Sequence, residues 1–274
     1  MEALKRHVGI GLVCLALLAG CASWHGGGPK AGDAQLWDRY LAAVAAAKYP
    51  DATKISRDLQ PILRSNPNVR WDADQTHVLM VTWTMRQHFL GKQPGQSFQL
   101  GRDAWLSAVP EIQAFCQNYS GADLEMRLRQ RLGLPPNSEN EVFLEIWVDP
   151  RDLFRPCPDP EITDTECQAE IPRAASTPGA SAMDQPPWRC PPGDVVEISG
   201  AALAVPKAHL EWMCNTWESS YRKCTKYPWT ALGYSYDWGA PMDYRAVSEY
   251  VAPKQTTVKF EALLPTREYC GKPH

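Results

Sequence analysis

Acidic residues are concentrated in one proline-rich stretch of the chain. The carboxylates of this stretch are Asp149, Asp152, Asp159, Glu161, Asp164 and Glu166. Cys157 and Cys167 lie among them, and prolines at 150, 156, 158 and 160 stiffen the backbone. Carboxylates on a stiff loop could bind Ca²⁺, which takes roughly six to eight oxygen ligands, or supply a general acid and a general base. The sequence therefore raises the hypothesis of an acidic site here.

Three arginines favour a different interpretation of the same stretch. Arg151, Arg155 and Arg173 lie next to the acids and could neutralise them as a structural ion-pair network. The spacing of a calcium-binding loop is also absent. We favour the structural network, and the acidic site formed by Asp149, Asp152, Asp159, Asp164 and Glu166 stays as the alternative.

A second stretch, 227–239, is rich in aromatic residues and reads Tyr-Pro-Trp-Thr-Ala-Leu-Gly-Tyr-Ser-Tyr-Asp-Trp-Gly. If its later half is extended, Tyr234, Tyr236 and Trp238 share one face. An exposed row of rings beside Asp237 could stack on sugar rings. The same row turned inward would be core, with each phenol needing one hydrogen-bond partner. We favour inward packing because the opposite face carries glycines, and ligand stacking stays open.

Common catalytic signatures are missing from the sequence. It contains no Gly-x-Ser-x-Gly, no His-Glu-x-x-His, no phosphate-binding Gly-x₄-Gly-Lys-Ser/Thr and no Gly-x-Gly-x-x-Gly. Among the histidines, His77 is of most interest because Asp72 and Asp74 lie close by. Catalytic groups assembled from distant positions are not excluded, so the catalytic residues, if any, are unknown at this stage.

Composition excludes several classes of protein. The 274 residues include 44% hydrophobic and 22% charged residues, which excludes disorder along the whole chain. Lys and Arg number 28 and Asp and Glu 31, so the net charge of −3 offers no bulk attraction for nucleic acid. The 11 tryptophans and 24 prolines favour a loop-rich fold with aromatic packing and β-structure.

The amino terminus has the pattern of a signal peptide. Lys5 and Arg6 precede an uncharged, apolar run from Val8 to Gly20, and Cys21 follows. As a helix this run would be about 20 Å long, which is too short for a hydrocarbon core of about 30 Å. We expect residues 1–20 to be a signal peptide and 21–33 to be a flexible tether.

The end of this run, Leu18-Ala19-Gly20-Cys21, resembles the lipobox of bacterial lipoproteins. The resemblance implies thioether diacylation of Cys21, cleavage before it and acylation of the new amino terminus. Ala22 is similar to the residue that lets such proteins continue to the outer membrane. We expect a membrane-anchored protein of the cell envelope that faces the periplasm.

Cysteine usage agrees with export. Cys14 would leave with the signal peptide, and the cysteines of the mature body are Cys116, Cys157, Cys167, Cys190, Cys214, Cys224 and Cys270. Seven thiols in an oxidising compartment predict three disulfides and one leftover cysteine. Local pairs are Cys157 with Cys167 and Cys214 with Cys224, while Cys116, Cys190 and Cys270 compete for the third. No metal-type Cys or His spacing exists, so we expect no metal and no cofactor.

Residue periodicity predicts one α+β domain over 34–274, with short helices packed against a mainly antiparallel sheet. The predicted helices are 33–48, 111–119, 123–132 and 210–221, and the predicted strands are 77–85, 105–109, 141–148, 195–205, 232–238 and 256–264. Stretch 174–193, rich in Pro, Ala and Ser, predicts an insertion. The domain would be loop-rich and disulfide-containing.

The body also resembles a group of exported bacterial proteins of unknown activity. The resemblance is carried by Trp105 to Cys116, by the Pro-Cys-Pro-Asp-Pro run after Asp149 and by the aromatic stretch 227–239. It implies a single folded unit and no particular reaction, ligand or site. We therefore expect a binding or scaffold module for an envelope protein or glycan. The alternative is a hydrolase of envelope polymers that uses carboxylates of the 149–166 loop.

Overall fold

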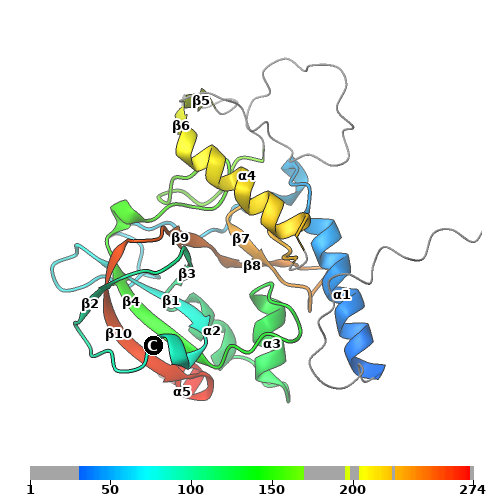
Figure 1. Ribbon diagram of the computed structural model, residues 1–274, viewed down its shortest axis with the longest axis horizontal. Coiled ribbons are helices and arrows are strands. Elements are labelled where there is room, and N and C mark those ends of the chain that lie inside the picture. The colour runs from blue at the N-terminus through cyan, green and yellow to red at the C-terminus, as the bar shows by residue number, and fades with distance from the viewer. Residues whose placement is uncertain (1–30, 170–194, 198–203, 224–225, 272–274) are drawn as a thin grey trace, which may run out of the picture.

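The computed structural model describes residues 31–169, 195–197, 204–223 and 226–271 (Figure 1). The predicted signal peptide, Cys21 and the 174–193 insertion lie outside these ranges, as do Arg173, Cys190 and Cys224. Helix α1 (Ala31–Ala47) begins inside the segment predicted as tether, which corrects the tether's end. Asp33 in its first turn is the residue type that favours a helix start there.

The core of the molecule is a six-stranded sheet in the order β2-β10-β4-β1-β3-β9, and all its pairings are antiparallel. Its strands are β1 (Val78–Thr84), β2 (Ser97–Gln99), β3 (Ala104–Ala108), β4 (Val142–Val148), β9 (Tyr250–Ala252) and β10 (Thr257–Pro265). Strands β1 and β4 pair along their whole length and are almost completely buried. The prediction of an α+β fold with a mainly antiparallel sheet is confirmed.

Short helices cover one face of this sheet. They are α2 (Glu111–Gln117), α3 (Leu124–Arg131) and α5 (Thr266–Gly271), and they pack on Leu79, Val81 and Phe143. Helix α3 ends before Gly133, which has the positive φ of 62° that favours glycine. Helices α2 and α5 are joined by the Cys116–Cys270 disulfide, whose Cα atoms are 5.4 Å apart.

The opposite face is covered by irregular segments instead of helices. Ile62, Val69, Leu153 and Ile162 pack there against the sheet. Two backbone hydrogen bonds, from Leu59 N to Thr165 O (3.0 Å) and from Ile62 N to Ile162 O (2.7 Å), tie these segments together. Three short 3₁₀ turns, Ala52–Lys54, Arg86–His88 and Pro150–Asp152, complete the loop-rich part of the fold.

A second core lies on the side of the molecule away from β2 and β10 (Figure 1). It joins α1 and α4 (Lys207–Tyr221) to strand β7 (Tyr234–Tyr236), around Tyr40, Met213 and Trp217. Strand β8 (Arg245–Ser248) pairs antiparallel with β7. Strands β5 (Val195–Glu197) and β6 (Ala204–Pro206) pair antiparallel, so the single strand predicted over 195–205 is wrong: the chain reverses within it.

In the described ranges, no helix has both the length and the apolar character that crossing a membrane requires.

Candidate functional site

The sheet opens between β1 and β3. These strands pair only at Met80↔Ala108 and Val81↔Ser107. Beyond that point β1 continues beside β4, whereas β3 pairs with β9 from Leu106 back to Ala104. Because β1 stays paired with β4 while β3 stays paired with β9, the facing edges of β1 and β3 diverge. The carbonyl of Trp83, at the diverging end of β1, accepts a hydrogen bond from Asn140 Nδ2 (2.6 Å).

A cleft with a volume of about 1180 Å³ lies at this opening. It is lined by the diverging ends of β1 and β3, by the segment between them, by one face of α4 and by the chain that follows α3. Sites for small molecules usually measure about 300–1,000 Å³. The cleft therefore has room for a ligand of several rings.

Tryptophans form one wall of the cleft. Trp105 and Trp212 have ring centroids 5.7 Å apart, and Trp229 meets Trp212 edge-on at 6.0 Å. The orientation of Trp212 is fixed because its Nε1 donates to Asp103 Oδ2 (2.8 Å). The other oxygen of Asp103 accepts a hydrogen bond from the backbone N–H of Lys254 (2.8 Å). Both oxygens of this carboxylate therefore hold the wall in place.

The face of α4 supplies hydroxyl and amide groups to the same cleft. Asn215, Thr216, Ser219 and Ser220 line it, and their spacing places them on one side of a helix. Asn215 is exposed, and Thr216 and Ser219 are half-buried. Such groups can both donate and accept hydrogen bonds. The cleft thus combines aromatic faces with neutral polar groups.

Glu249, between β8 and β9, places a carboxyl group at the cleft. Its Oε2 is inaccessible to solvent and has no hydrogen-bond partner in the described part of the chain. Burial raises the pKa of Glu249 to about 8, because the low-dielectric surroundings disfavour the charged form. The raised pKa favours the protonated form of this carboxyl group at neutral pH.

The predicted acidic residues do not gather into one site, and none of the five lines the cleft. Asp149 pairs with Arg151, whose hydrogen bonds lower the pKa of Asp149 to about 2. Asp164 pairs with Arg155, and Glu166 Oε2 lies 3.5 Å from Arg57 Nε. Asp152 is exposed on the 3₁₀ turn that follows Asp149.

Asp159 is the one buried member of the predicted acidic set. Burial raises its pKa to about 6, and its Oδ1 accepts a hydrogen bond from Glu161 N (3.4 Å). The acids of this stretch thus have separate surroundings and mostly separate cationic partners. Arginine pairs at Asp149, Asp164 and Glu166 support the structural-network interpretation, and the acidic-site alternative stays a prediction.

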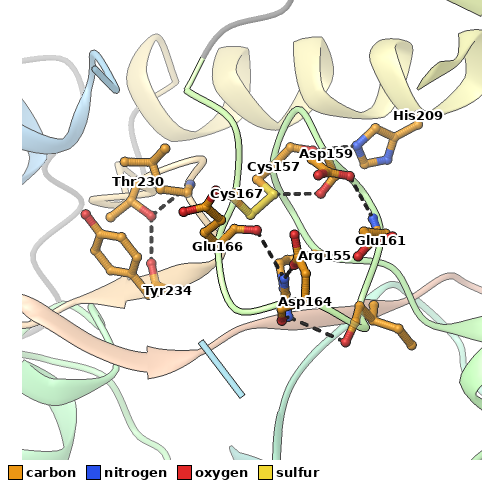
Figure 2. The surroundings of a disulfide bond; sticks show 12 residues. Arg155, Cys157, Asp159, Glu161, Asp164, Glu166, Cys167, His209, Thr230 and Tyr234 are labelled. Carbon is orange, nitrogen blue, oxygen red and sulfur yellow. Dashed lines mark hydrogen bonds and ion pairs between the residues drawn. A yellow bond between two sulfur atoms is a disulfide. The ribbon is translucent and has the colours of Figure 1, made fainter. Parts of the chain in front are cut away.

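The Cys157–Cys167 disulfide closes this loop, as predicted (Figure 2). Arg155 lies beside it with a fully buried side chain and donates to the backbone carbonyls of Gln60 (3.3 Å) and Asp164 (2.9 Å). Gly233, with a φ of 75°, packs so closely that a Cβ would lie 2.8 Å from both Arg155 and Cys167. The part of the 149–167 loop between Arg155 and Cys167 is thus tightly packed.

The remaining cysteine predictions have mixed outcomes. Cys116 and Cys270, two of the three competitors for one bridge, pair with each other. Cys214 is disulfide-bonded, but Cys224 lies outside the described residues, so their pairing stays a prediction.

The aromatic row of 234–238 is buried, so the prediction of inward packing is confirmed and the exposed stacking row is wrong. Tyr234, Tyr236 and Trp238 are 1%, 8% and 2% exposed. Tyr234 Oη donates to the carbonyl of Lys54 (2.8 Å), and Trp238 Nε1 donates to that of Leu134 (3.0 Å). Core packing gives these rings more apolar contact than a surface row would. Of these three residues, Tyr236 is the one that lines the cleft.

His77 pairs with Asp72, as their proximity in sequence suggested. Its Nδ1 lies 3.0 Å from Asp72 Oδ2. Burial opposes ionisation of Asp72, but hydrogen bonds from the N–H groups of His77 and Thr76 outweigh it and lower the pKa to about 2. This pair belongs to the turn before β1 and does not line the cleft.

Sequence reasoning missed the cleft altogether. Its lining comes from positions between 82 and 249, and no local motif joins them. The spacing of the polar residues on α4 is a signal, but such a stripe is also typical of a solvated helix face.

Comparison with known proteins gives no relative: no family model, no curated protein and no solved structure matches the chain. Among the described residues, no group of three or more His, Cys, Asp or Glu side chains could hold a metal ion. The fold and the site therefore define a disulfide-bonded α+β domain with an open, tryptophan-walled cleft.

Proposed function

We propose that this chain is a lipid-anchored binding protein of the bacterial cell envelope, whose cleft between β1 and β3 binds a glycan. The observation that carries the proposal is the pairing of two surfaces in one cleft. The tryptophan wall can stack on the C–H faces of sugar rings, and the α4 face offers hydrogen bonds to their hydroxyl groups. The volume of about 1180 Å³ suits an oligosaccharide.

The anchor in this proposal is Cys21. Two or three acyl chains on that residue and its amino group would hold the domain at the membrane, since a single chain gives only marginal binding. The outer membrane, with the domain facing the periplasm, is the proposed location, and the partner is an envelope glycan in preference to a protein.

Glycan hydrolysis is the weaker candidate. The predicted hydrolase would use the acids of the 149–166 loop, which do not line the cleft. The two carboxyl groups that do line it are Asp103 and Glu249. If the register of β3 with β9 is extended by one residue at each end, their backbone positions lie four residues apart, about 13 Å along the sheet. Paired-carboxylate glycosidases need a separation of about 5–9.5 Å.

Glycan binding can be tested with the full lipoprotein purified in detergent. The double variant Asn215→Ala, Ser219→Ala removes two cleft groups and adds residues that favour a helix. We expect its affinity for neutral oligosaccharides, measured by calorimetry, to fall about tenfold, the loss of one or two hydrogen bonds. Glu218→Ala, on the same helix but outside the cleft, is the matched control and should bind like the parent.

Equal affinities of the parent and the double variant would contradict the proposed site. The anchor is tested separately by mass spectrometry of the protein isolated from its host. We expect an amino terminus at an acylated Cys21. An unmodified terminus at any other residue would refute the anchor and leave the cleft proposal standing.

A further inference from the structure

One end of the cleft is cationic although the whole chain has a net charge of −3. The segment from Arg86 to Arg102, which joins β1 to β3, contains no Asp and no Glu. It places His88, Lys92 and Arg102 along the cleft. No ion pair involves these three side chains among the described residues. The positive charges of Lys92 and Arg102 are therefore available to a ligand.

The position of Lys92 is defined by an aromatic contact. Its Nζ lies 4.0 Å from the centroid of the Phe98 ring, and both residues line the cleft. A cation–π contact of this kind holds the ammonium group without using its N–H donors. Arg102 is exposed at the turn before β3, where its planar guanidinium can form two parallel hydrogen bonds to a carboxylate or phosphate.

The acidic groups of the cleft offset this charge only in part, because Lys92 and Arg102 face one formally charged carboxylate, Asp103, and the buried Glu249. Asp103 lies next to Arg102, and its two oxygens are held against Trp212 and the Lys254 backbone by hydrogen bonds from neutral donors, which leave its formal charge in place. Burial raises the pKa of Glu249 to about 8, which favours its protonated form at neutral pH. An anionic ligand would therefore meet two cations at one end, Lys92 and Arg102, with Asp103 facing Trp212 and the Lys254 backbone.

From this arrangement we infer that the ligand is an acidic glycan, whose carboxylate or phosphate is held by Lys92 and Arg102 while its rings stack on the tryptophan wall. The inference rests on the proposed glycan-binding function and extends it to a chemical class. Lys92 and Arg102 can donate hydrogen bonds to a carboxylate or to a phosphate, so the experiment must distinguish these two anions.

The test uses the full lipoprotein in detergent and follows tryptophan fluorescence, because indoles line the cleft. Three probes of similar length are titrated: a neutral glucose oligomer, a uronic acid oligomer and a glucose oligomer phosphorylated at one end. We expect at least one acidic probe to bind about tenfold more tightly than the neutral one. Raising salt from about 50 mM to about 300 mM should weaken only acidic probes.

The double variant Lys92→Gln, Arg102→Gln should lose most of this preference and keep its affinity for the neutral oligomer within about twofold. The matched control is Arg57→Gln, Arg151→Gln, which removes the same charge from exposed positions outside the cleft. This control should keep the preference, since screening limits the reach of distant surface charges.

The outcomes separate the two proposals. Binding of all probes with equal affinity would overturn the acidic-glycan inference and leave glycan binding intact. Equal loss of acidic and neutral binding in the Lys92, Arg102 variant would also overturn it. Binding of no probe would overturn the proposed function and this inference together. A preference for the uronic acid or for the phosphate probe would identify which anion the site takes.

Discussion

The 149–167 loop and the cleft contain similar kinds of residues, but they use them differently. In the loop, Arg155 donates to surrounding carbonyls and to Asp164, and the disulfide closes the backbone around it (Figure 2). In the cleft, Lys92 and Arg102 have no acidic partner among the described residues, and Oε2 of Glu249 has no hydrogen bond there. The loop pairs most of its charged groups internally, although the buried Nε of Arg155 has no hydrogen-bond partner among the described residues. The cleft leaves Lys92 and Arg102 without an ion pair there.

Local density of charge along the sequence is therefore a poor guide to function in this protein. The loop is the most acidic stretch of the sequence, and its acids mainly serve the fold. The cleft has no comparable concentration in the sequence. It forms where groups from separate elements meet without neutralising one another.

The largest expected effect tests the structural role of the loop. Arg155→Met removes a fully buried guanidinium and leaves the carboxylate of Asp164 and several carbonyls without their donor. We expect the free energy of unfolding, from urea denaturation, to fall by about 3–5 kcal/mol. Arg151→Met, at an exposed ion pair of the same loop, should leave the denaturation midpoint unchanged. A small effect of Arg155→Met would mean that the loop is not the structural unit described.

The loop disulfide should have the next largest effect. Replacing Cys157 and Cys167 by alanine opens a loop with a sequence separation of 10. Chain entropy predicts a loss of about 3 kcal/mol. Ligand affinity should not change, because neither cysteine lines the cleft. The same urea measurement and a binding titration check both points, and a loss of affinity with an intact fold would show that loop and cleft are coupled.

The buried carboxyl group of Glu249 makes the free energy of unfolding depend on pH. In the unfolded chain its pKa is the ordinary 4.5, and burial raises it to about 8 in the fold. Below about pH 4.5 the carboxyl group is protonated in both the folded and the unfolded state. As pH rises towards 8 the unfolded state releases the proton first, so stability falls, by about 2 kcal/mol between about pH 5 and pH 7. Glu249→Gln should flatten this part of the curve.

Glu111 is a matched control for this prediction. Burial raises its pKa to about 7, its Oε1 accepts hydrogen bonds from Ser248, and it does not line the cleft. Glu111→Gln should therefore reduce the pH dependence of unfolding without changing ligand affinity, whereas Glu249→Gln should change both. If the two variants have the same effect on binding, Glu249 has no special role at the cleft.

The weakest effect should come from two acids at the start of the loop, half-buried Asp149 and exposed Asp152. Asp149→Asn together with Asp152→Asn removes two charges from the most acidic stretch. Because surface ion pairs are screened by water and salt, we expect no measurable change in the urea midpoint or in glycan affinity. A clear loss of glycan affinity would restore the acidic loop as a functional site.

Much of the fold could be predicted because it depends on local patterns. The helix at 33–48 follows from Leu36, Trp37, Tyr40 and Val44 at helical spacing, and β4 follows from its run of apolar residues. Strands β2 and β9 have three residues each, which is too few to show a period. They exist because longer neighbours, β10 and β3, offer them an edge to pair with.

The sequence by itself determined the α+β class, the antiparallel sheet and the Cys157–Cys167 bridge, because hydrophobic periodicity and short loop closure are local properties of a chain. Three-dimensional packing was needed to choose the inward orientation of Tyr234, Tyr236 and Trp238 over the exposed one, to pair Asp149 and Asp164 with arginines and to place Glu249 beside a cleft. These outcomes depend on strand register and on which segments cover each face of the sheet. A site built from the divergence of two strands has no counterpart in the order of residues along the chain.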